Sequence, residues 1–347
     1  MLDQALTQRI AGLVAGADGS ATALPGDLAA LCADAERDVV AYTGMRPAAG
    51  LPSPEAVGRP AWIAANVATM DTTLEPVAAR VGEGLGPLGA PARAAVGMVV
   101  SVEAGALMGY LSQRVLGQYE LALLDPARTP RLLFVAPNIT AAARRMEVDE
   151  AQLLAWIALH EVTHAVQFGS VGWLRDHVAG LLGELLASLE LTVDARALLR
   201  LPGRDDLRAL VDAVREGGLV SAFAGPERQG ILDRLQVVMA VVEGHAEHVM
   251  DVVGARTLQA LPELRAALDR RRRERPPLLA LLDRLIGLES KLRQYEDGKR
   301  FCDAVVAAAG PAALHRVFDA PERLPTLAEL DDPGAWIRRT GVRAVTP

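Results

Sequence analysis

The chain has 347 residues, enough for one large or two ordinary domains with an ample hydrophobic core. Its formal net charge of -7 at pH 7 argues against general binding to nucleic acid, and its one basic run, at 270–273, is typical of a solvated helix end. Hydrophobic residues make up 51% of the sequence. However, Glu103, Glu184 and Glu190 interrupt the most apolar stretches, so none reaches the roughly 20 uncharged residues that span a bilayer.

Two further features bear on the cellular location. The N-terminus lacks the basic region and apolar core of a signal peptide. The two cysteines, Cys32 and Cys302, lie far apart and outside any Cys-x-x-Cys spacing, so we predict neither a disulfide framework nor a thiolate zinc site. We therefore expect a cytoplasmic protein that binds neither nucleic acid nor membranes.

The first 116 residues predict a bundle of helices without chemistry of its own. Helical patterns cover residues 2–15, 25–42, 61–81 and 92–116, and loops of Gly, Pro and small residues separate them. In the last of these helices, Gly97, Gly105 and Gly109 recur at a spacing that predicts close packing against another helix. We treat residues 1–116 as an N-terminal helical part.

Residues 117–136 differ in character and predict a β-hairpin. Two short apolar runs, 117–124 and 131–136, flank a turn rich in Asp and Pro. No other stretch of the sequence gives a good strand signal. The hairpin lies immediately upstream of the most informative helix in the chain.

That helix is predicted over residues 150–168 and contains the pattern His-Glu-x-x-His at 160–164. Histidines four residues apart project from one face of a helix, and their neutral imidazoles can hold one zinc ion. The intervening Glu161 can take a proton from a zinc-coordinated water. Asp149 is a suitable N-cap and Gly169 a suitable stop. Chance spacing of two histidines is the alternative, but burying these side chains in an apolar helix without a partner would be costly.

Helical patterns continue to the C-terminus. They cover residues 173–201, 205–216, 226–253 and 278–309, and short helices broken by prolines follow. We treat residues 117–347 as a catalytic part that packs with residues 1–116 as one compact unit.

A catalytic zinc site needs a third protein ligand besides His160 and His164. The candidates lie within residues 242–251. Glu243 and Glu247 are four residues apart, so they share one helical face. One carboxylate would bind zinc, and the other would accept a hydrogen bond from a ligand histidine and fix its tautomer.

Two more histidines lie in the same stretch. His245 projects from a different face of the helix than the glutamates, and His248 directly follows Glu247. A lone histidine rarely ligates a metal, so the sequence favours an ordinary buried or solvated role for both.

The combination of segments resembles the gluzincin metallopeptidases. The pattern at 160–164 is followed by Glu-Gly-His-Ala-Glu-His at 243–248, and in many gluzincins a Glu-Gly-x-Ala-Glu segment supplies the third ligand through its first glutamate. The resemblance implies that Glu243 is the ligand and that Glu247 supports a ligand. The two segments stand further apart than in aminopeptidase-type or thermolysin-like members, and an inserted helical layer would explain this.

A second resemblance covers nearly the whole chain. It is carried by the segments at 115–120, 135–139, 160–164 and 287–296. They are similar to one bacterial family whose members are named zinc-dependent metalloproteases or candidate hydrolases. The sequence resembles the branch labelled as associated with biosynthesis of the deazaflavin coenzyme, a label that implies genomic association rather than a reaction.

We therefore predict a mainly α-helical, zincin-like fold with a small β-hairpin. We expect one zinc ion per chain, held by His160, His164 and Glu243. The favoured function is hydrolysis of a peptide or amide bond, with Glu161 as general base and later proton donor. The substrate is then a peptide or protein, bound by an exposed strand of the hairpin through backbone hydrogen bonds, although a purely structural hairpin fits equally well.

Three side chains are candidates to stabilise the oxyanion, namely Tyr119, Tyr295 and His248, and the sequence does not rank them. One alternative function is hydrolysis of a small-molecule amide or ester in coenzyme metabolism, which would need a deep closed pocket. The other is a non-catalytic zincin-fold scaffold or partner-binding protein. An intact Glu161 argues against the scaffold, whereas a fourth ligand such as His248 would favour it.

Overall fold

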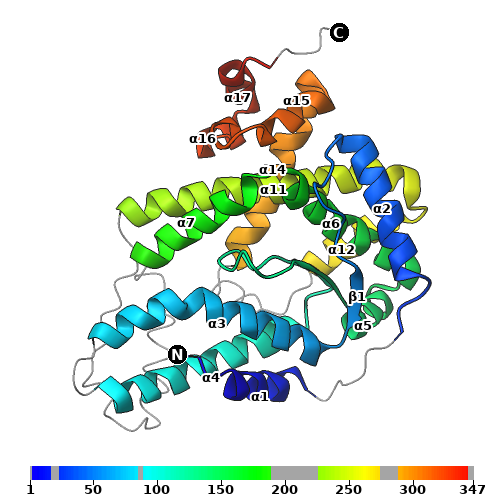
Figure 1. The fold of residues 1–347 in the computed structure, drawn as a ribbon. Helices are drawn as coiled ribbons and strands as arrows, with labels where there is room; N and C mark the ends of the chain where they lie inside the picture. The colour runs from blue at the N-terminus through cyan, green and yellow to red at the C-terminus, as the bar shows by residue number, and fades with distance from the viewer. Residues whose placement is uncertain (1, 17–22, 85–88, 189–225, 274–287, 343–347) are drawn as a thin grey trace.

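A computed structural model of the protein describes residues 2–16, 23–84, 89–188, 226–273 and 288–342. Helices make up most of these residues, and the strands among them form one small three-stranded sheet (Figure 1). The predicted mainly helical fold with a small β element is therefore confirmed. None of the helices in the described ranges is long and apolar enough to cross a membrane.

The sheet has the strand order β1-β3-β2. β2 (Gly117–Glu120) and β3 (Arg131–Val135) are antiparallel, with Gly117 opposite Phe134, so the predicted hairpin is confirmed. β1 (Pro54–Val57) pairs in parallel with β3. The sequence predicts a loop there, and this prediction is wrong. Four residues bounded by Pro and Gly give no alternation to detect, and they become a strand only because β3 supplies the hydrogen-bond partners.

β3 is the buried centre of the sheet and β2 is an edge. Residues 132–135 are fully buried, as expected for an apolar run covered on both faces. The amide of Val135 donates to the carbonyl oxygen of Leu116 at 2.8 Å. Because backbone groups alternate along a strand, the polar groups of Gly117 and Tyr119 point away from β3.

The helix predicted to hold the metal, α6 (Glu150–Ser170), lies at the centre of the larger core. Its first turn is capped as predicted, because the carboxylate of Asp149 accepts a hydrogen bond from the Gln152 amide at 2.8 Å. α2 (Leu28–Thr43) and α11 (Pro226–Thr257) pack against it (Figure 1). Leu132 and Phe134 of β3 join apolar side chains of these three helices in one buried cluster, whereas Leu133 and Val135 belong to a second cluster with the N-terminal helices.

α11 meets α14 (Leu288–Ala309) where neither helix has a side chain. A Cβ atom built on Gly244 would overlap the backbone of Gly298, and one built on Gly298 would overlap the backbone of Ala240. Glycine is therefore required at both positions, because the two helix backbones touch directly.

The N-terminal part shows a similar close approach. α4 (Gly89–Ser112) packs on α1 (Gln4–Ala15). A Cβ atom on Gly105 would lie 2.7 Å from the carbonyl oxygen of Thr7, and one on Gly109 would lie 2.6 Å from another backbone oxygen of α1. The helix contact predicted from these glycines is confirmed.

The other helices are α3 (Arg59–Gly84), α5 (Ala136–Met146), α7 (Leu174–Ser188), α12 (Leu261–Arg273), α15 (Pro311–His315), α16 (Leu327–Asp331), α17 (Pro333–Thr340) and the 3-10 turns η2 (Arg316–Phe318) and η3 (Pro321–Arg323). The predicted helix at 205–216 lies outside the described residues. The division into residues 1–116 and 117–347 stays a prediction, although β1 and α2 of the first part contact β3 and α6 of the second.

The contact between α11 and α14 yields the first testable prediction. Gly244→Ala should lower the free energy of unfolding by roughly 1–3 kcal/mol or more, because the added methyl group has no room to relax. Gly230→Ala on the same helix is the matched control, since a Cβ atom there meets nothing within 4 Å. Urea denaturation measures both, and equal stability of the two variants would contradict the prediction.

Candidate metal centre

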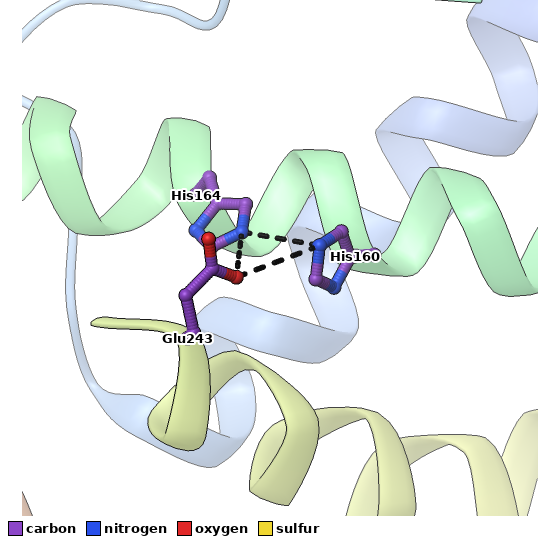
Figure 2. Close-up of side chains that lie close together, drawn as sticks. All are labelled: His160, His164 and Glu243. Carbon is purple, nitrogen blue, oxygen red and sulfur yellow. Dashed lines mark hydrogen bonds and ion pairs between the residues drawn. The ribbon is translucent and has the colours of Figure 1, made fainter. Parts of the chain in front are cut away.

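Three side chains from two helices converge at one point (Figure 2). His160 and His164 come from α6, and Glu243 comes from α11. The Nε2 atoms of the two histidines are 3.2 Å apart, and the Oε2 atom of Glu243 lies 3.2 Å from Nε2 of His164 and 3.9 Å from Nε2 of His160. Among the described residues, no other group of three or more potential ligand atoms is clustered in this way.

Two of these distances are close to those around a zinc ion. Four ligands arranged tetrahedrally at ~2.0–2.2 Å from zinc lie roughly 3.3–3.6 Å from one another, and Oε2 of Glu243 would have to move slightly toward His160 from its distance of 3.9 Å. Two imidazole nitrogens and one carboxylate oxygen are also ligands that zinc commonly takes. In the absence of a metal ion, one of the two Nε2 atoms would carry a proton and donate it to the other at 3.2 Å, and a metal ion would take the place of that proton. The structure thus brings together the three residues that the sequence predicts as ligands, and their binding of a metal stays a prediction.

Nδ1 of His164, on the ring side away from Glu243, contacts Gln167, a residue that the sequence did not predict to be part of the site. Gln167 lies three residues further along α6, is completely buried, and its Oε1 is 2.9 Å from Nδ1 of His164. Its Nε2 lies 2.9 Å from both the carbonyl oxygen of Val242 and Nδ1 of His245. The available signal was a polar residue at i+3 from a ligand, on the same helix face.

The ring of His160 has different neighbours. Its Nδ1 lies 3.1 Å from the sulfur of Met250, and its ring stacks on that of Trp156 at a centroid distance of 6.5 Å. Met250 is seven residues after Glu243 on α11, so both project from the same face of that helix. α11 thus contacts both ligand histidines.

Glu161 lies against the edge strand. It is 7% exposed, and its Oε2 accepts a hydrogen bond from the backbone amide of Tyr119 at 2.8 Å. A Cβ atom on Gly117 would lie only 2.7 Å from Cγ and 2.8 Å from Oε1 of Glu161. Glycine in β2 therefore leaves the space that the carboxylate occupies, and the next outward-facing amide of the strand fixes its direction.

Charge in this region favours a bound cation. Burial disfavours the protonated form of His164, but the carboxylates of Glu243 and Glu161 outweigh this and raise its pKa from 6.5 to about 9. A proton and a metal ion are both cations, so the same carboxylates attract a metal to this place. His245 behaves oppositely: burial, together with nearby imidazoles, lowers its pKa well below 6.5, so it is neutral.

Glu247 lies one turn from Glu243 and contacts a different partner. Its Oε2 is 2.5 Å from Nη1 of Arg265, and Arg265 also pairs with Asp251. The Nδ1 atoms of His160 and His164 contact Met250 and Gln167. The predicted role of Glu247 in supporting a ligand stays a prediction.

The structure describes the side chains of two of the three candidates for oxyanion stabilisation, Tyr119 and His248. The ring of Tyr119 packs beside Phe168 at a centroid distance of 6.2 Å, and burial raises the pKa of its phenol, which keeps it a hydrogen-bond donor. Tyr295 lies outside the residues whose side chains the structure describes. All three assignments, including that of His248, stay predictions.

His248 is engaged away from the metal ligands. Its Nε2 lies 2.7 Å from the hydroxyl of Tyr42, and its Nδ1 lies 2.6 Å from Oδ1 of Asp303. Both ring nitrogens are therefore used in contacts with α2 and α14. A fourth ligand from His248 would require these two hydrogen bonds to break.

The three-residue group yields the second prediction. The purified protein should carry about one zinc ion per chain, and His160→Ala or His164→Ala should abolish loading. Glu243→Gln should lower zinc affinity strongly. Glu247→Gln, the same change one turn along α11, is the matched control and should lower affinity by no more than roughly ten- to a hundred-fold.

Zinc content by plasma mass spectrometry and affinity by competition with a chelator measure these effects. Stoichiometric zinc in both histidine variants would contradict the site. A larger loss in Glu247→Gln than in Glu243→Gln would move the third ligand one turn along α11.

Comparison with known proteins supports the same chemistry. A solved structure from Chloroflexus aurantiacus, described as a candidate hydrolase with a novel fold, is 28% identical to the chain. It superimposes with a TM-score of 0.72 over 99% of this chain and 100% of that one. No curated protein matches the sequence significantly. The model of the zincin-like metallopeptidases matches residues 2–337, so the chain belongs to the family of zincin-like metallopeptidases.

Proposed function

We propose that the protein is a zinc-dependent hydrolase that cleaves a peptide bond or a similar amide bond. The convergence of His160, His164 and Glu243 on one point carries the proposal. Three protein ligands leave a fourth position open, as in catalytic zinc sites, whereas structural zinc sites are normally closed by four. The engagement of His248 with Tyr42 and Asp303 supports the enzyme over the scaffold.

Zinc at this point would polarise a carbonyl group and lower the pKa of a water molecule toward neutrality. Glu161 is the residue placed to move the proton. The amide of Tyr119 holds Oε2, so we assign Oε1 to accept the proton and to return it to the leaving nitrogen. A carboxylate fixed by a backbone amide needs no rearrangement of side chains before the transfer.

The edge strand favours a peptide as substrate. Gly117 and Tyr119 direct their backbone groups away from β3, and no strand covers that edge among the described residues. An extended peptide can pair with such an edge by adding hydrogen bonds. The amide of Tyr119 already binds Glu161, so the pairing would use the remaining backbone groups and would bring the peptide alongside the proton-transferring carboxylate.

The third prediction tests Glu161 as the base. Glu161→Gln keeps the size of the side chain but removes its basicity, so fold and zinc content should survive while turnover falls about 10²–10⁴-fold. The assay is a peptide library together with small-molecule amides and esters, including those expected around deazaflavin coenzyme metabolism. Cleavage of the small molecules alone would shift the substrate class. Equal cleavage by the variant would show that Glu161 is not the base.

The fourth prediction tests the support that β2 gives to this base. In Gly117→Ala the new methyl group would collide with Glu161 and displace its carboxylate. Turnover should fall on the order of 10²-fold with zinc content unchanged, because small misplacements of a reacting group are costly. Gly180→Ala on α7 has open space around the new Cβ atom and serves as control. Wild-type turnover in Gly117→Ala would show that β2 does not support the base.

A further inference from the structure

A buried chain of polar groups links the ligand His164 to α11. It runs from Nδ1 of His164 to the amide of Gln167, and from there to the carbonyl oxygen of Val242 and to Nδ1 of His245, each step at 2.9 Å. Gln167 and His245 are both 0% exposed. Polar groups buried this deeply are costly unless hydrogen bonds satisfy them, so their arrangement is highly constrained.

The carbonyl oxygen of Val242 determines which atom carries each hydrogen in this chain of polar groups. A carbonyl can only accept, so the NH2 group of Gln167 faces Val242 and His245, and the amide oxygen faces His164. His164 must then donate from Nδ1, and in the neutral form that binds a metal this leaves the lone pair on Nε2, the atom that faces Glu243. His245 accepts at Nδ1, so its own hydrogen is on Nε2.

We propose that Gln167 and His245 are positioning residues that hold His164 in the tautomer and orientation that bind zinc. This inference rests on the proposed zinc function. Gln167 contacts the ligand ring directly, and His245 acts through Gln167 by giving its second N–H an acceptor. The segment at 243–248 thus contributes a zinc ligand, Glu243, and two residues later a buried histidine that orients the ligand of another helix.

If this chain of polar groups had a purely structural role, variants of it would behave differently. Packing alone would be served by an apolar side chain of similar volume at either position, and zinc binding would not depend on hydrogen-bonding groups. A positioning role depends on the acceptor at Nδ1 of His245 rather than on the ring. The variants below separate the two roles, because Gln167→Met and His245→Phe fill the space but remove the hydrogen-bonding group, whereas His245→Asn fills less space but keeps the acceptor.

The experiment compares Gln167→Met, His245→Phe and His245→Asn in the full-length chain. Gln167→Met removes the amide at similar volume. His245→Phe keeps the ring and removes the acceptor, whereas His245→Asn places an oxygen where Nδ1 lies. Gln152→Met is the control, because Gln152 is on the same helix and its side-chain oxygen accepts hydrogen bonds from the backbone amides of Gln259 and Ala260, away from the two histidines.

Two properties are measured on each protein, whose folding is checked by thermal unfolding. The first is zinc affinity, from competition with a chelator. The second is the Nδ1–H proton of His164 in the zinc-loaded protein, from NMR with labelled histidine. Neither measurement depends on finding a substrate.

We expect Gln167→Met to weaken zinc binding by roughly ten- to a hundred-fold and to abolish the protected Nδ1–H signal of His164. His245→Phe should weaken binding about tenfold, and His245→Asn should recover most of that loss. The control should match the wild type. If Gln167→Met fails to fold, the comparison of His245→Phe with His245→Asn decides by itself.

The outcomes separate this inference from the proposed function. Tight zinc binding by the wild type and equally tight binding by Gln167→Met would overturn the inference and leave the function standing. Equal losses in well-folded His245→Phe and His245→Asn would overturn the role of His245. A wild-type protein that binds no zinc would overturn the proposed function, and the inference with it.

Discussion

The direct contact between the backbones of α11 and α14 determines where Glu243, the proposed third ligand, lies. Gly244 and Gly298 leave no side chain between the two helices, so the distance between their axes is set by backbone atoms that cannot yield. Glu243 is the residue next to this contact, and its carboxylate reaches Nε2 of His164 at 3.2 Å. One methyl group at the crossing would push α11 away from α14 and displace this carboxylate. The glycine in the Glu-Gly-x-Ala-Glu segment is therefore needed because it allows the close contact between α11 and α14.

The edge strand β2 positions Glu161, the proposed base, as the helix contact positions Glu243. Two residues of β2 shape the surroundings of Glu161: Gly117 leaves space for it, and the Tyr119 amide binds its carboxylate. The other two contact the neighbouring elements: Gln118 exchanges hydrogen bonds with side chains of α3, and Glu120 contacts a threonine of α3 and an arginine of the hairpin turn. The short strand is thus anchored to the N-terminal helices, and it transmits their position to Glu161.

Local patterns in the sequence predicted what short-range geometry determines. The spacing of His160 and His164, the Asp149 cap and the β-hairpin all follow from helix and strand periodicity. Glu243 came from a resemblance, since nothing local indicates which later residue meets the histidines. β1 and Gln167 were missed because their roles depend on partners about 75 residues away, β3 and the Val242 carbonyl. Such contacts have no periodicity to detect.

The positions of the two histidines are set locally, whereas the position of Glu243 is set by a long-range contact. Gln167 contacts both parts of the site. The two histidines keep their spacing because they belong to one buried helix, whereas Glu243 depends on how α11 docks. Gln167 donates to the carbonyl of Val242, the residue immediately before Glu243, and accepts from His164. A shift of α11 would therefore move the carboxylate and loosen the orientation of the imidazole at once. Because both losses come from one displacement, the affinity for a metal ion should fall more steeply with helix movement than separate contacts would allow.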